Sequence, residues 1–165
     1  MRYVLRQKIL SWGEDFTIHD ESGREVYYVD GKAFSLGHQL SILDFAGREQ
    51  AYIRQKLLSW GPSYTVERGG EVLAVVRKHL STLFACKFTV DVPGPDDLEA
   101  SGGLLDHEYT FERGGRTVAR VTKHWVSFSD SYGVEIDDDE DQVLILASAV
   151  VIDLACHDSA HGGKH

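Results

Sequence analysis

An almost unbroken apolar run, residues 143–152, lies near the C-terminus and limits the folds open to this chain. The wider segment 141–156 is longer than a usual strand and rich in Ala and Leu, which favours a helix; a fully buried strand is the competing interpretation. Acidic residues at 139–141 are typical of a helix N-terminus. Because this helix has no polar face, it must be enclosed on all sides.

A strand–turn–strand unit occurs twice before this run. Tyr64–Gly70 recurs as Tyr109–Gly115, and the match continues to Lys78-His79 and Lys123-His124. In both copies a Gly-Gly pair separates two runs of β-type residues, which is the spacing of a hairpin turn with positive φ. The repeats therefore predict β-hairpins.

Weaker repeats and alternations extend the pattern over the rest of the chain. A third copy spans residues 16–29 and turns at Ser22-Gly23, and residues 6–13 recur as residues 54–61. Apolar and polar residues also alternate at residues 88–92 and 126–129, which predicts half-buried strands.

The segment 93–103 interrupts these strands with prolines and glycines, so we predict an exposed loop there.

The half-buried strands need an apolar cover, and the helix needs a complete enclosure. A closed antiparallel β-barrel around the C-terminal helix satisfies both. The helix, at 1.5 Å per residue, would be roughly 24 Å long, comparable with the height of a barrel of tilted strands. We expect one domain over residues 1–158 and a disordered tail over residues 159–165.

Several short motifs, in this order, resemble the LURP-one-related family, a branch of the superfamily that contains tubby C-terminal domains and phospholipid scramblases. They are Leu5–Lys8, the glycine hairpins, and Ser131–Ile136 followed by an acidic stretch and the apolar run to Asp153. The resemblance covers nearly the whole chain and implies a barrel of about twelve strands around a central C-terminal helix. Relatives are variously linked to phosphoinositide binding, to lipid scrambling or to no known activity. This sequence lacks the cysteine-rich and proline-rich segments of scramblase-like members, which disfavours calcium-dependent scrambling.

The composition argues against some partners and compartments. Acidic residues outnumber Lys and Arg by 26 to 17, which disfavours nucleic acid as a partner. The N-terminal residues lack the apolar core of a secretory signal, and the apolar run is about half of the ~20 residues that cross a bilayer. We therefore expect a cytoplasmic protein without a transmembrane segment, able to lie peripherally at a membrane. Cys86 and Cys156 are expected to be reduced and buried.

Basic residues at matching repeat positions are the candidate ligand-binding residues. The two Lys-His pairs could form similar edges for a phosphate or lipid headgroup. Arg6, Lys8, Arg54 and Lys56 form a second duplicated set. The alternative is that repeated strands keep these charges for solubility alone. The predicted ligand-binding residues are Lys78, His79, Lys123, His124, Arg54 and Lys56.

Other conspicuous residues have simpler interpretations. Residues 137–141 could supply oxygen ligands to calcium, but they lack the spacing of an EF-hand, so a solvated loop is favoured. The tryptophans Trp12, Trp60 and Trp125 are expected in the core rather than on a ligand-binding surface. Histidines at 157, 161 and 165 near Cys156 indicate adventitious metal binding, so we predict no metal site and no cofactor. Asp153 must be paired if buried, for example with an arginine on a strand.

The sequence carries none of the common catalytic motifs, including G-x-S-x-G, the Walker loop, H-E-x-x-H and C-x-x-C. We therefore predict no catalytic residues, although a site assembled from distant residues stays open. A barrel filled by its own helix leaves little room for a substrate, so a ligand should bind outside it. The expected function is a non-enzymatic module that binds anionic phospholipid or a membrane surface. The alternative is a protein-interaction or regulatory scaffold.

Overall fold

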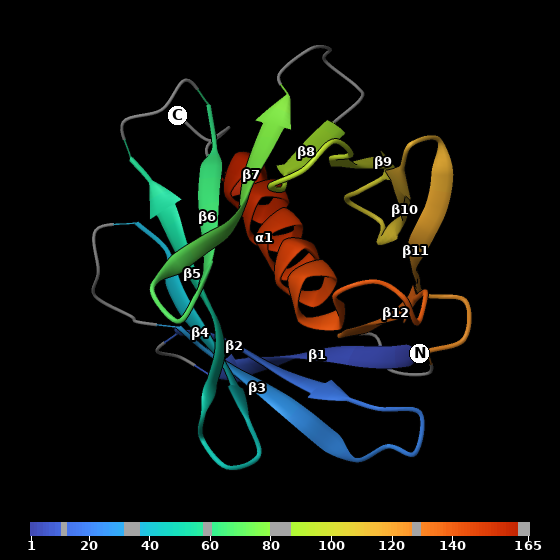
Figure 1. The fold of residues 1–165 in the computed structure, drawn as a ribbon. Coiled ribbons are helices and arrows are strands. Elements are labelled where there is room, and N and C mark those ends of the chain that lie inside the picture. The colour runs from blue at the N-terminus through green and yellow to red at the C-terminus, as the bar shows by residue number, and fades with distance from the viewer. Residues whose placement is uncertain (11–12, 32–36, 58–60, 80–86, 127–129, 162–165) are drawn as a thin grey trace.

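The computed structural model describes residues 1–10, 13–31, 37–57, 61–79, 87–126 and 130–161. Within this part of the chain, twelve strands form a closed barrel and one helix, α1, runs through it (Figure 1). The elements are β1 (Arg2–Leu10), β2 (Gly13–His19), β3 (Glu25–Gly31), β4 (Gln39–Asp44), β5 (Glu49–Lys56), β6 (Ser63–Arg68), β7 (Glu71–His79), β8 (Lys87–Asp91), β9 (Leu98–Gly103), β10 (Glu108–Arg113), β11 (Arg116–Thr122), β12 (Ser131–Ile136) and α1 (Gln142–His161).

The strands follow one another around the barrel in chain order, and each pairs antiparallel with the next. The first strand closes the barrel against the last, with Leu5 opposite both Tyr132 of β12 and Ile18 of β2. Every strand that the structure describes thus has a neighbour on both sides. The predicted closed antiparallel barrel is confirmed.

The two Gly-Gly pairs form the predicted hairpin turns. Gly69 and Gly70 connect β6 to β7 with φ of 58° and 83°, and Gly114 and Gly115 connect β10 to β11 with φ of 57° and 80°. Two consecutive residues with positive φ define the turn whose twist matches that of paired strands, and glycine adopts this conformation without steric cost.

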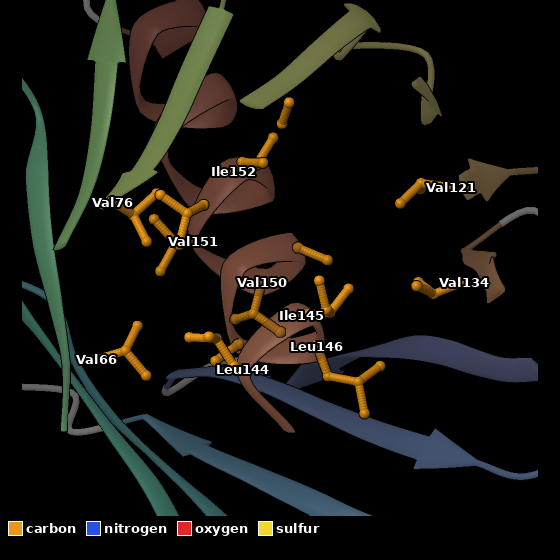
Figure 2. Packing of buried hydrophobic residues seen from close by; sticks show 14 of the residues in the cluster. Val66, Val76, Val121, Val134, Leu144, Ile145, Leu146, Val150, Val151 and Ile152 are labelled. Atoms are coloured by element: carbon orange, nitrogen blue, oxygen red, sulfur yellow. The ribbon is translucent and has the colours of Figure 1, made fainter. Parts of the chain in front are cut away.

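The helix is the centre of the core. Every residue of α1 from Val143 to Cys156 is buried, and the apolar residues of the strands meet it from all sides of the barrel. Figure 2 shows Val66 and Val76 pointing at the helix from one side, and Val121 and Val134 from the opposite side. The predicted enclosure of the helix is confirmed.

The helix begins where the acidic residues end. Asp141 caps it, because its Oδ1 accepts a hydrogen bond from the backbone N–H of Leu144 at 3.1 Å. Its far end lies beyond the predicted one: α1 continues to His161, so residues 159–161 of the expected disordered tail are helical. Residues 162–165 lie outside the described residues.

The prediction of a loop over residues 93–103 is wrong for its second half, where β9 pairs with β8 and β10. Leu98 and Ala100 are buried, so this short stretch alternates like the other strands. The glycines permit pairing here, because a Cβ on Gly102 would lie 2.9 Å from the carbonyl oxygen of Glu108. Of the strand predicted at 126–129, Val126 lies outside any strand and residues 127–129 are outside the described residues.

Candidate functional site

Because the buried helix fills the barrel, the outer wall is the surface that is open to a ligand. Alternation along each strand decides which side chains reach this wall. On β5, Ala51 and Ile53 point inward, so Arg54 and Lys56 point outward. On β7, Ala74 and Val76 are the inward residues, which places Arg77 and His79 outside and Lys78 on the inner side near the end of the barrel.

Strand register brings four of these outward cations, together with Lys87, onto one surface. Lys56 lies opposite Ser63 of β6, and Ser63 lies opposite Arg77 of β7. His79 is the partner of Lys87 on β8. We call this surface the β5–β8 face, and it consists of Arg54, Lys56, Arg77, His79 and Lys87.

Three cations of the β5–β8 face have carboxylate neighbours on adjacent strands. Arg54 Nε lies 3.8 Å from Glu67 Oε2, Lys87 Nζ lies 3.1 Å from Glu99 Oε2, and Arg77 is paired with Asp91. These arginine and lysine side chains are about half exposed, and such surface pairs are each worth only about 0–1 kcal/mol. An anionic ligand could therefore replace Asp91 and Glu99, which are 35% and 54% exposed, at small cost, whereas Glu67 is only 19% exposed. His79 Nε2 shares a hydrogen bond with Thr89 Oγ1.

The second predicted Lys-His pair lies elsewhere. Strand β7 continues through Lys78 and His79, whereas β11 ends at Thr122 and the chain turns at Lys123. The strands β8, β9 and β10 separate the two pairs around the barrel. The pairs match in sequence but not in structure, so they do not form one site.

Glu108 on β10 holds the turn at Lys123. Its Oε1 accepts hydrogen bonds from the backbone N–H of Lys123 at 2.8 Å and from Thr122 Oγ1 at 3.0 Å. The hydrogen bond from Lys123 is the main reason that the pKa of Glu108 lies below its ordinary value. His124 Nε2 is 3.6 Å from the other carboxylate oxygen and its side chain is 85% exposed, so it contributes a surface contact.

Arginines at the ends of two strands bind acids of the stretch 137–141. Arg68 binds Asp141 with two hydrogen bonds of 3.0 and 3.1 Å, and Arg113 binds Glu140 with two of 2.9 and 3.3 Å. Arg68 and Arg113 precede the Gly-Gly turns at equivalent repeat positions. The duplicated motif thus holds the start of the helix, a role that sequence reasoning missed.

The acidic stretch carries arginine contacts but no metal site among the described residues. Partial burial alone would raise the pKa of Asp141, but the hydrogen bonds from Arg68 and Leu144 outweigh it and leave this pKa below its ordinary value. Among the residues that the structure describes, no group of three or more His, Cys, Asp or Glu side chains is arranged to hold a metal. The stretch is an exposed loop before the helix, as predicted, and within it Glu140 is the acid whose side chain is buried against an arginine.

Replacing Arg113 with alanine is expected to lower the free energy of unfolding by about 2–3 kcal/mol, because the Glu140 side chain is only 8% exposed and would lose its cation. Arg116→Ala is the matched control. Arg116 lies 3.4 Å from Asp139 but is 63% exposed, so its loss should cost no more than about 0.5 kcal/mol. Urea denaturation of both variants measures the difference, and equal losses would contradict the importance of the buried contact.

Asp153 is paired inside the barrel, but its partner differs from the expected arginine. His107 Nε2 lies 2.6 Å from Asp153 Oδ1, and the two side chains are 13% and 6% exposed. His107 sits in the β9–β10 turn with φ of 54°, and its ring stacks on Tyr132 at 4.3 Å. Burial, with the nearby Asp153 carboxylate as a further cause, raises the pKa of Tyr109 and Tyr132 well above that of free tyrosine.

The remaining predicted residues are only partly described. Within the described residues Cys156 is buried and in no disulfide, as predicted, and Cys86 lies outside the described residues, as do Trp12 and Trp60. Trp125 was expected in the core, but it is half-buried and covers Gly133 on the outer wall. The segment 157–161 belongs to α1, and the side chains of its histidines and His165 are outside the described part. No helix within the described ranges is long and apolar enough to cross a bilayer.

Comparisons with known proteins agree with this architecture. The family model described as LURP-one-related matches residues 1–153. The uncharacterized protein YxjI of Bacillus subtilis (strain 168) is 32% identical over 153 residues, which cover 93% of this chain and 92% of that protein. The X-ray structure of the Arabidopsis thaliana protein AT5G01750 matches with a TM-score of 0.66 at 17% identity, over 94% of this chain and 91% of that one.

Proposed function

Because the chain belongs to the LURP-one-related family, we propose that it is a non-enzymatic binding module that holds an anionic phospholipid surface against the outer wall of its barrel. The observation that carries this proposal is the burial of the helix from Val143 to Cys156, which fills the space where other barrels hold ligands. A membrane, unlike a small substrate, needs no cavity. Such a module would act as a peripheral protein at a cytoplasmic membrane surface.

The β5–β8 face is the surface that we assign to the lipid. Neighbouring strands lie about 4.8 Å apart, so Lys56 and Arg77, two strands apart in one row, are separated by about 10 Å. Side chains of this length can reach phosphates of adjacent headgroups, and guanidinium groups bind phosphate with two hydrogen bonds. The chain as a whole has a net charge of −9, so attraction to an anionic membrane must come from a local surface of this kind.

The test is flotation with vesicles of phosphatidylcholine alone and with 30% phosphatidylserine. We expect retention only on the anionic vesicles. The double variant Lys56→Glu/Arg77→Glu should reduce partitioning at least tenfold, since each basic residue near an anionic surface contributes about 1 kcal/mol. Arg120→Glu is the control, because Arg120 is exposed on β11 and lies away from this face.

Two results would contradict the lipid proposal: no retention of the wild-type protein on anionic vesicles, or an equal loss of binding in Arg120→Glu. Adding calcium to parallel samples also tests the calcium-dependent alternative, which predicts retention only in its presence.

A protein partner is the second candidate function, and one feature favours it. Phe45, in the β4–β5 turn, is 96% exposed, which is unusual for so large an apolar side chain. It borders a hollow that also contains Val26, Tyr28 and Leu43 on β3 and β4. Apolar surface of this kind is common where proteins bind each other. Retention of a purified partner that Phe45→Ser abolishes, without vesicle binding, would favour this function.

A further inference from the structure

A separate pocket of about 470 Å³ lies on the outer wall over β12, β1 and β2, within the size range of small-molecule sites. We call it the Trp125 pocket. It is lined chiefly by Arg2, Val4 and Arg6 of β1, His19 of β2, Trp125 and Ser131, with the β2–β3 turn at its edge. It lies away from the β5–β8 face in the strand order.

Strand register gives the pocket an apolar floor. Val4 lies opposite Gly133 on one side and His19 on the other. A Cβ on Gly133 would meet Trp125 Cζ2 at 2.2 Å, so the indole lies directly on β12 only because this residue is glycine. Gly133 thus makes room for the Trp125 indole next to Val4.

Two arginines flank this floor. Arg2 and Arg6 project outward on either side of Val4, with Cα atoms about 13 Å apart at the usual rise of a strand. Arg2 Cζ lies 5.5 Å from the centre of a Trp125 ring, and the side chains of Arg2 and Arg6 are 53% and 47% exposed. Their Nε atoms lie 3.5 Å from Glu135 and 3.7 Å from Asp130, and these half-exposed surface pairs are each worth only about 0–1 kcal/mol.

The acidic residues at the edge of the pocket already serve the protein backbone. Asp20 Oδ1 accepts hydrogen bonds from the backbone N–H groups of Ser22 and Arg24, and Glu21 Oε1 accepts one from the N–H of Arg2. These contacts hold the β2–β3 turn and the start of β1. Arg2 and Arg6 are the arginines that line the pocket.

We propose that the Trp125 pocket binds a small organic anion in which a planar ring carries a phosphate or carboxylate group. The ring would lie on Val4 and against the Trp125 indole, and the anionic group would bind Arg6 and Arg2. Arginine suits both parts of such a ligand, because its planar group stacks on rings and forms paired hydrogen bonds with anions. This inference is independent of the membrane proposal and uses a different face of the barrel.

Isothermal titration with 1-naphthyl phosphate tests the proposal on the full chain. We expect saturable binding of one molecule per chain, and much weaker binding of inorganic phosphate and of 1-naphthol, which each carry half of the ligand. Arg6→Gln should weaken binding about tenfold, the usual effect of losing a charged hydrogen bond. Trp125→Ala should weaken it as well. Arg116→Gln is the matched control, because Arg116 is exposed on β11 and belongs neither to this pocket nor to the β5–β8 face; it should leave binding unchanged.

The proposal is overturned if the wild-type protein shows no saturable binding at millimolar 1-naphthyl phosphate. It is equally overturned if Arg6→Gln binds as tightly as wild type, or if either half-ligand does. Circular dichroism checks that Trp125→Ala is folded. If it is not folded, the binding measured for Arg6→Gln alone tests the proposal. Loss of vesicle binding in Lys56→Glu/Arg77→Glu with naphthyl phosphate binding intact would separate the two sites.

Discussion

Replacing Leu146 with aspartate is expected to unfold the barrel. Leu146 lies in the enclosed part of α1 and is fully buried. The variant would lose the burial of a leucine, which is worth about 2–5 kcal/mol, and would also place an unpaired carboxylate among apolar side chains. The sum, more than about 5 kcal/mol, is comparable with the whole stability of a domain of this size. Urea denaturation followed by circular dichroism measures the effect.

Leu105→Asp is the control for this variant. Leu105 lies between β9 and β10 and is 64% exposed, so the same chemical change should cost less than about 0.5 kcal/mol. If the aspartate at 146 prevents expression, Leu146→Ala should fold with a loss of about 2–5 kcal/mol. If Leu146→Asp and Leu105→Asp lose the same free energy of unfolding, the helix is not the core of the barrel.

The second large effect is expected from His107→Gly, which should lower the free energy of unfolding by about 3–5 kcal/mol at pH 7. Removing the imidazole leaves the Asp153 carboxylate buried without the partner that now lies 2.6 Å away. Glycine is chosen because φ at this position is 54°, a conformation that glycine adopts without strain.

A double variant separates the charge from the packing in this prediction. His107→Gly/Asp153→Leu removes both polar groups, so we expect it to recover much of the stability lost in the single variant, since apolar residues can replace a buried polar pair at little cost. Chemical denaturation of both variants gives the comparison. If the double variant is as unstable as His107→Gly, the loss comes from the missing ring and its stacking on Tyr132 and not from an isolated carboxylate.

Local patterns in the sequence predict most of this fold. The Gly-Gly turns at 69–70 and 114–115 specify hairpins because few other residues adopt positive φ twice in succession. The run from Val143 to Cys156 specifies an enclosed helix because the helix has no polar face that could be exposed to solvent. Local composition misleads at β9, where glycines that usually end strands instead permit close pairing with β10.

The candidate sites were less predictable, because they depend on register and on contacts between distant segments. Lys78 and His79 are neighbours in sequence but face opposite sides of β7, and a shift of one residue would exchange them. Arg77, which the structure adds to the β5–β8 face, has no distinguishing sequence context. The partner of Asp153 lies 46 positions away, in a turn that shows no pattern in the sequence.

The pairing of β1 with β12, followed directly by the helix, has a consequence for how the protein is made. The helix α1 follows the described strands in the chain, so they emerge from the ribosome before the segment that they surround. The contacts between the first and last strands join the segments farthest apart in the sequence of the barrel, so it can close only after β12 has been made. Until residues 143–156 have emerged, the nascent strands lack the segment that covers their apolar faces.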